Sequence, residues 1–143
     1  MNKSIFKKCR ALVPLLLVLH SSPLFAQGKA PEDPQFKKVL TAVQEAVAQN
    51  APEKVADLSN FPKFSWELPG LGDDLSRDTF LKNYQKIFTP EIKAKLATGK
   101  FHPTQNRDYA LEWNKKTENY ILIFERQTDG SYKFAGLAVG PAD

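Results

Sequence analysis

Few side chains in this sequence could hold a metal ion or act as a nucleophile. The 143 residues contain one cysteine and two histidines. Zinc, copper and iron sites need several histidine, cysteine or carboxylate ligands that converge, so we expect no metal site and no cofactor. No aspartate-rich loop with the spacing of a calcium site occurs either. The chemistry that remains is that of a histidine, scattered carboxylates and aromatic side chains.

His102 is the side chain best suited to proton transfer near neutral pH. It lies in Phe101-His102-Pro103, which its polar surroundings predict to be a loop. A histidine on such a loop either overhangs a pocket and shuttles protons or has no role. Because no nucleophile-elbow sequence accompanies it, we assign no catalytic residue.

Aromatic residues are the more informative group, since they make up 11% of the chain. Most of them must lie in the core, where burying one ring contributes about 1.5–3 kcal/mol. Trp66 and Trp113 each carry an indole N–H that needs a partner, so at least one of them suits a cavity mouth or an interface. The candidate pocket or interface residues are Trp66, Tyr84, His102, Tyr109 and Trp113.

The N-terminal segment has the pattern of a bacterial secretory signal peptide. Four basic residues accompany an apolar run at 11–19, which is too short to span a bilayer. We expect cleavage after Ala26, with an uncleaved membrane anchor as the alternative. Residues 27–33 are predicted to form a flexible lead-in and residues 34–143 a single α+β domain, without stable membrane insertion. The expected location is the periplasm or the cell exterior.

The net charge of +4 belongs to this N-terminal segment. Removing residues 1–26 takes away four of the 20 basic residues and none of the 16 acidic ones, so the remaining chain has no net charge. The one cysteine, Cys9, is removed as well, so the mature domain cannot depend on disulfides. A neutral domain offers no electrostatic basis for binding nucleic acid.

Apolar residues recur at helical spacing through the first half of the mature chain. The spacing and the stop signals predict helices over residues 34–49, 51–58, 76–88 and 90–98. A capping residue precedes each of them. These predicted caps are Asp33, Asn50, Ser76 and Thr89.

The period changes to that of strands at residues 64–68 and again over the last third of the chain, where three antiparallel strands are predicted. The middle strand, around residues 120–124, is apolar on both faces, as expected for a central strand covered on two sides. Asp129-Gly130 predicts a two-residue hairpin turn. With that turn, the facing pairs are Arg126 with Lys133, Phe124 with Ala135, and Leu122 with Leu137, while Ile121, Ile123 and Phe134 share the opposite face.

Helices can cover one apolar face of this predicted sheet. The other face needs cover from sheet curvature, from a partner, or from a second copy of the chain. We therefore expect a homodimer through the sheet or a sheet that binds a partner.

The order of these elements resembles that of the nuclear-transport-factor-2-like superfamily. The resemblance covers residues 34–139 and includes FLKNYQKIFTP at 80–90 and DGSYKF at 129–134. It identifies a small exported bacterial member of α+β class, with helices packed on a curved antiparallel sheet that forms a cone around a pocket. Only four strands are predicted, three in the meander and one short one, so an open sheet with helices on one face also fits.

The same resemblance implies an alternative function. Some members are isomerases or dehydratases that place a carboxylate and a tyrosine in the cavity. The counterparts in this chain would be Glu112 or Glu125 with Tyr84, Tyr109 or Tyr120. Both glutamates suit an outward strand position equally well.

The scarcity of reactive side chains and the zero net charge favour an exported binding or interaction module with no catalysis of its own. Its ligand is an unknown protein or small molecule. An isomerase or dehydratase is the alternative, and a structural component of the cell envelope is a third.

Overall fold

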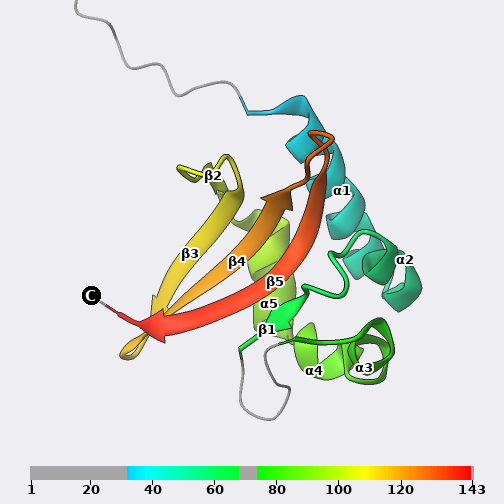
Figure 1. Ribbon diagram of the computed structural model, residues 1–143. Helices are drawn as coiled ribbons and strands as arrows, with labels where there is room; N and C mark the ends of the chain where they lie inside the picture. The colour runs from blue at the N-terminus through cyan, green and yellow to red at the C-terminus, as the bar shows by residue number, and fades with distance from the viewer. Residues whose placement is uncertain (1–31, 68–73, 143) are drawn as a thin grey trace, which may run out of the picture. The chain divides into compact units, whose positions relative to one another are not determined.

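The computed structural model describes residues 32–67 and 74–142 (Figure 1). The helices of this part are α1 (Pro34–Ala48), α2 (Pro52–Asp57), α3 (Arg77–Lys82), α4 (Tyr84–Ile87) and α5 (Pro90–Thr98). The strands are β1 (Ser65–Trp66), β2 (His102–Pro103), β3 (Tyr109–Lys115), β4 (Glu118–Arg126) and β5 (Tyr132–Pro141). The predicted signal peptide, residues 1–26, lies outside the described residues, as does the lead-in up to residue 31. None of the described helices combines the length and the apolar character needed to cross a membrane.

Three of the four predicted helix caps are confirmed. Asp33, Ser76 and Thr89 each accept a hydrogen bond from a backbone N–H in the first turn of α1, α3 and α5. The prediction for Asn50 is wrong, because this residue has φ +51° and ends α1 instead of beginning α2. Its N–H donates to Val47 O and the next N–H donates to Ala46 O, which satisfies the last carbonyls of α1.

Residues 76–88 form two helices, α3 and α4, where the sequence predicts one. The break falls at Asn83, whose side-chain Nδ2 donates to Thr79 O at 2.9 Å while its backbone N–H bonds the same carbonyl. An asparagine side chain that competes for a helix carbonyl favours termination. The predicted apolar stripe is still confirmed, since both helices bury it. Its buried members are Phe80, Tyr84, Ile87 and Phe88.

The strands form one mixed sheet in the order β1-β5-β4-β3-β2, and it does not close into a barrel. The expected antiparallel meander is confirmed for β3, β4 and β5. The expectation of a purely antiparallel four-stranded sheet is wrong in two respects, because β1 pairs with β5 in parallel and β2 adds a fifth strand. His102 belongs to this added edge strand and not to a loop. In Figure 1, β5 curves across the sheet, and the strands pass in front of α5.

The hairpin between β4 and β5 contains two deviations from the predicted register. Gln127 N donates to Ser131 O, so the turn holds three residues, and Gly130 provides the left-handed position at φ +85°. Arg126 therefore faces Tyr132 and Phe124 faces Phe134, which corrects both predicted pairs.

An irregularity between Ile123 and Phe124 then restores the predicted register. Leu122 faces Leu137 as expected, because the extra residue in β5, Ala135, cancels the longer turn. Phe134 lies between the longer turn and the bulge, so its face is reversed: it was predicted to lie beside Ile123 but is fully buried in the core.

Gly136 explains how β1 can join the sheet directly after this bulge. Its φ is +126°, and a Cβ atom placed on it would lie 1.8 Å from Ser65 O. Only a residue without a side chain allows the β1 backbone to approach so closely.

Aromatic rings fill the layer between the helices and the sheet. Phe36 of α1 stacks on Tyr109 of β3 with ring centroids 3.7 Å apart. Phe134 of β5 meets Phe124 at 5.1 Å and Phe64 at 5.5 Å. The sheet face beneath the helices is therefore packed with aromatic rings over the described residues.

Candidate functional site

The five candidate residues do not come together in one place. Trp66, Tyr84 and Tyr109 are all at most 6% exposed and belong to the core. His102 lies on the sheet face away from the helices, and Trp113 lies near the end of β3. The structure thus separates them into a buried group and two surface positions.

Trp66 and Tyr84 flank the ring of Phe88 inside the core. Their centroids lie 6.1 Å and 4.7 Å from that ring. Among the described residues, neither the Trp66 indole Nε1 nor the Tyr84 hydroxyl has a hydrogen-bond partner. Burial raises the pKa of Tyr84 above its ordinary value, so this hydroxyl stays protonated at neutral pH. Trp66 fills the core instead of a cavity mouth.

Tyr109 takes part in a cluster that links the start of α1 to the sheet. The Asp33 N–H donates to Tyr109 Oη at 3.0 Å, and Tyr132 Oη donates to Asp33 Oδ2 at 3.0 Å. A backbone hydrogen bond from Gln35 lowers the pKa of Asp33. Burial, aided by Asp33, raises the pKa of Tyr132 to about 12. The cluster is an anchor for α1, with a charged acceptor and a neutral donor.

Sequence reasoning identified Asp33 as a helix cap but missed its partner. Asp33 and Tyr132 are 99 positions apart, and no local pattern connects them. The sequence does contain one related signal: the proline after Asp33 marks the start of α1, which is the end of the helix that Tyr132 contacts through Asp33.

Trp113 lies at the end of the sheet with one face against Tyr120. The two rings stack at 5.4 Å, and Lys95 Nζ lies 5.2 Å from the Trp113 ring centre. Lys115 Nζ bonds Glu91 Oε2 at 2.7 Å, and this contact is the main cause of the lowered pKa of Glu91.

The two glutamates proposed for catalysis both point away from the helices. Glu112 Oε1 lies 3.5 Å from His102 Nε2, and both side chains are about half exposed. Glu125 Oε2 accepts a hydrogen bond from Asn60 Nδ2 at 2.6 Å. The tyrosines that were to assist them alternate onto the helix side, so strand geometry separates each carboxylate from its intended partner.

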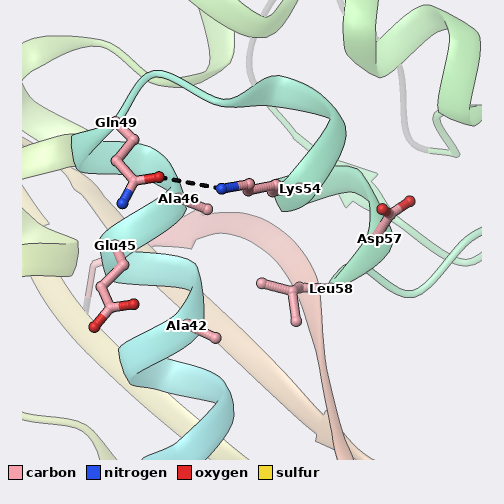
Figure 2. A pocket seen from close by; sticks show the side chains of 7 residues that line it. All are labelled: Ala42, Glu45, Ala46, Gln49, Lys54, Asp57 and Leu58. Carbon is pink, nitrogen blue, oxygen red and sulfur yellow. Dashed lines mark hydrogen bonds between the residues drawn. The ribbon is translucent and has the colours of Figure 1, made fainter.

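Two surface hollows are lined by described residues. One, of about 250 Å³, lies at the end of β3 and is lined by Glu112, Trp113, Asn114 and Asn119. The other, of about 340 Å³, lies between α1 and α2 (Figure 2). Figure 2 shows Lys54 reaching across the second hollow to Gln49, with Nζ and Oε1 3.3 Å apart. Its lining residues are Ala42, Glu45, Ala46, Gln49, Lys54, Asp57 and Leu58.

Neither hollow brings together the ligands of a metal ion. Within residues 32–67 and 74–142, no group of three or more histidine, cysteine or acidic side chains could hold one. The His102–Glu112 pair has no third ligand there.

No protein-family model matches the chain, and no curated protein matches its sequence. Among solved structures, it is similar to a Shewanella frigidimarina protein provisionally named a ketosteroid isomerase, with 14% identity and a TM-score of 0.47 over 76% of this chain and 96% of the other. A variant named Rd1NTF2_05 has 8% identity and a TM-score of 0.40 over 73% and 96% of the two chains. A Xanthomonas campestris protein provisionally named a calcium/calmodulin-dependent protein kinase II association domain has 18% identity and a TM-score of 0.36 over 75% and 82%.

These likenesses concern the arrangement of helices and strands alone. The described residues themselves show the α+β architecture that the sequence predicts, with helices on one face of a curved, unclosed sheet. This is the architecture that the resemblance to the nuclear-transport-factor-2-like superfamily implied.

Proposed function

We propose that residues 27–143 act after export as a binding module that docks a partner protein on the open face of the sheet. The open face is the side away from the helices. The observation that carries the proposal is an apolar strip in the middle of this face. Cross-strand register places Ala110, Ile123 and Gly136 in one row, and Ile121 with Ala138 in the next, where Glu112 is the one charged member.

Polar rows border the strip on both sides. Asn114 faces Asn119 at one border, and Glu125 faces Lys133 at the other. Ala110 and Gly136 are buried, whereas Ile121, Ile123 and Ala138 remain partly exposed and form the part of the strip that a partner can reach. An apolar centre with a polar rim is the usual composition of a protein interface.

The position of the carboxylates weighs against the isomerase or dehydratase alternative. Glu112 and Glu125 lie on the open face, while Tyr84 is buried on the helix side. A general acid or base must come within hydrogen-bond reach of the same substrate as its partner. The intervening sheet keeps these groups apart.

Site-specific photo-crosslinking in the source cell tests this proposal. A photoreactive residue at Ile121 or Ile123 should capture the same protein, and one at the exposed Lys38 of α1 should not. The captured protein is then purified, and its binding to the mature chain is measured by calorimetry. Ile121→Lys should weaken binding at least about tenfold, because it places a charge in the strip, whereas Lys38→Ala should leave it unchanged.

Two results would contradict the proposal. One is equal capture from all three positions, which would indicate nonspecific contact. The other is substrate turnover by the purified mature chain that disappears in Glu112→Gln or Glu125→Gln. Export itself is tested by cell fractionation and by the mass of the mature protein, which should begin at Gln27.

A further inference from the structure

The two edges of the sheet differ in how many of their backbone groups have hydrogen-bond partners. Along β5, Phe134 exchanges backbone hydrogen bonds with Leu58 and Asn60, and Glu67 N donates to Leu137 O. The Val139 N–H donates to Glu67 Oε2 at 2.8 Å. Backbone groups of this edge thus have partners at residues 134, 137 and 139.

The β3 edge is open over most of its length. The short strand β2 pairs only with Tyr109 and Ala110. Within the described residues, no backbone group lies against the outer edge of β3 from residue 111 to residue 115. Unpaired strand edges of this kind are templates for another strand.

The ladder shows which backbone groups face outward. Thr104 N donates to Asp108 O at 2.8 Å, and hydrogen-bonded pairs alternate along an antiparallel ladder. His102 with Ala110 is therefore the next hydrogen-bonded pair of β2 and β3. The N–H and C=O groups of Glu112 and Asn114 point the same way as those of Ala110, away from β4.

Only one antiparallel pairing of two such edges uses all of these groups. With a twofold axis at Trp113, Glu112 pairs with Asn114 of the second copy, and Asn114 pairs with its Glu112, which forms four hydrogen bonds. An axis at Glu112 would require Ala110, which β2 already occupies. An axis at Asn114 would pair Glu112 with Lys116, which lies in the turn at φ +57°.

The side chains agree with the same register. It sets Glu112 opposite an asparagine, whereas an axis at Glu112 would set two glutamates against each other. On the helix side it brings the two Trp113 rings together at a non-hydrogen-bonded pair, where side chains approach most closely.

The edge lacks the usual barriers to pairing. The pairing of β3 with β4 is regular from Tyr109 to Lys115, without a bulge, and this segment contains no proline. Its one lysine, Lys115, is held on α5 by Glu91 at 2.7 Å.

We infer from this geometry that two copies of the chain pair through their β3 strands, with the twofold axis at Trp113, into one continuous ten-stranded sheet. The open faces of both copies stay free, so this dimer is independent of the partner docking proposed above.

Light scattering on the mature chain gives the first test. The protein should have twice the monomer mass at micromolar concentration. Asn114→Pro removes an outward N–H without disturbing the β4 ladder, so it should raise the dissociation constant at least about tenfold. The matched control, Ile121→Lys, should leave the dimer intact.

Single cysteines then determine the register, because residues 27–143 contain none. Trp113→Cys should form a disulfide-linked dimer under mild oxidation. Glu112→Cys and Asn114→Cys should each remain uncrosslinked alone and should form a mixed disulfide when combined. Circular dichroism of each variant verifies that it is folded.

Several outcomes would overturn the inference. A monomer at millimolar concentration would do so, and slow amide exchange at Glu112 and Asn114 in that monomer would indicate that another segment of the chain covers the edge. Dissociation by Ile121→Lys with an intact Asn114→Pro dimer would place the contact on the open face. Self-crosslinking at Glu112 or Asn114 alone would exclude the register.

Discussion

The two faces of the sheet differ in how deeply they bury neighbouring residues of the same strand. On the helix side, Leu122 and Phe124 are fully buried among aromatic rings. On the other side, Ile121 and Ile123 remain partly exposed beside polar rows. The helix side provides most of the stability, while the other side contributes less and is the face that we propose a partner binds. A domain of this size can thus bind without weakening its core.

Among the variants that test this difference between the two faces, Phe134→Ala should have the largest effect on the free energy of unfolding. The ring is fully buried and meets Phe64, Trp66, Phe88 and Phe124. Its removal should lower the free energy of unfolding by about 3–5 kcal/mol. Urea unfolding followed by tryptophan fluorescence measures the change, and a loss below about 1 kcal/mol would mean that the rings do not form a close-packed core.

Gly136→Ala should have the next largest effect. The residue has φ +126°, and the added methyl group would collide with Ser65 O. Backbone strain of this kind costs about 1–3 kcal/mol. Gly140→Ala is the matched control, because no atom lies within 4 Å of its Cβ position, and it should unfold like the wild type. Equal effects at both glycines would contradict the close approach of β1 to β5.

Tyr132→Phe should destabilise the domain by roughly 0.5–1.5 kcal/mol, because it removes the hydrogen bond to Asp33. The effect should depend on pH. The folded state raises the pKa of Tyr132 to about 12, whereas an unfolded tyrosine titrates near pH 10. The wild type should therefore keep this contribution below about pH 10 and lose it as the pH rises toward the folded pKa.

Urea unfolding at neutral and at alkaline pH measures the Tyr132→Phe effect. The difference between variant and wild type should shrink above about pH 10. Tyr120→Phe is the comparison, since its hydroxyl bonds the exposed Glu118, which also raises the pKa of Tyr120, so its effect should be smaller but should fall with pH in the same direction. If the difference in unfolding free energy between Tyr132→Phe and the wild type did not change with pH, the folded state would not raise the pKa of Tyr132.

Ile121→Lys should have the smallest effect on stability, about 1 kcal/mol or less, because lysine retains an aliphatic stem along the strand. The same change should abolish partner docking. Thermal unfolding followed by circular dichroism measures the first effect. A destabilisation as large as that of Phe134→Ala would show that both faces of the sheet contribute equally to the stability of the fold.

Much of this architecture could be predicted because its causes are local. Asp33, Ser76 and Thr89 cap helices through hydrogen bonds that span two or three residues. The meander follows from alternation and a hairpin turn. Asn83 shows the limit of periodicity, since the apolar stripe continues past it while the helix does not.

The candidate site was less predictable. The type of a residue indicates what it could do, but the face that it occupies depends on register. Adding one residue to the turn at Gly130 reversed the predicted face of Phe134, and the bulge at Ala135 then restored the pairs beyond it. Trp66 shows the same dependence, because its place in the core follows from the pairing of β1 with β5.

The sequence by itself determined the starts of α1, α3 and α5, the strand periodicity, the aromatic core and the shortage of catalytic side chains, because each depends on composition or on residues within one or two turns. The tertiary structure decided the parallel pairing of β1, the contact of Asp33 with Tyr132, the separation of the glutamates from the tyrosines, and the unpaired β3 edge. These features join residues that are far apart in the chain. Their geometry is set by how the sheet packs against the helices, which no local pattern encodes.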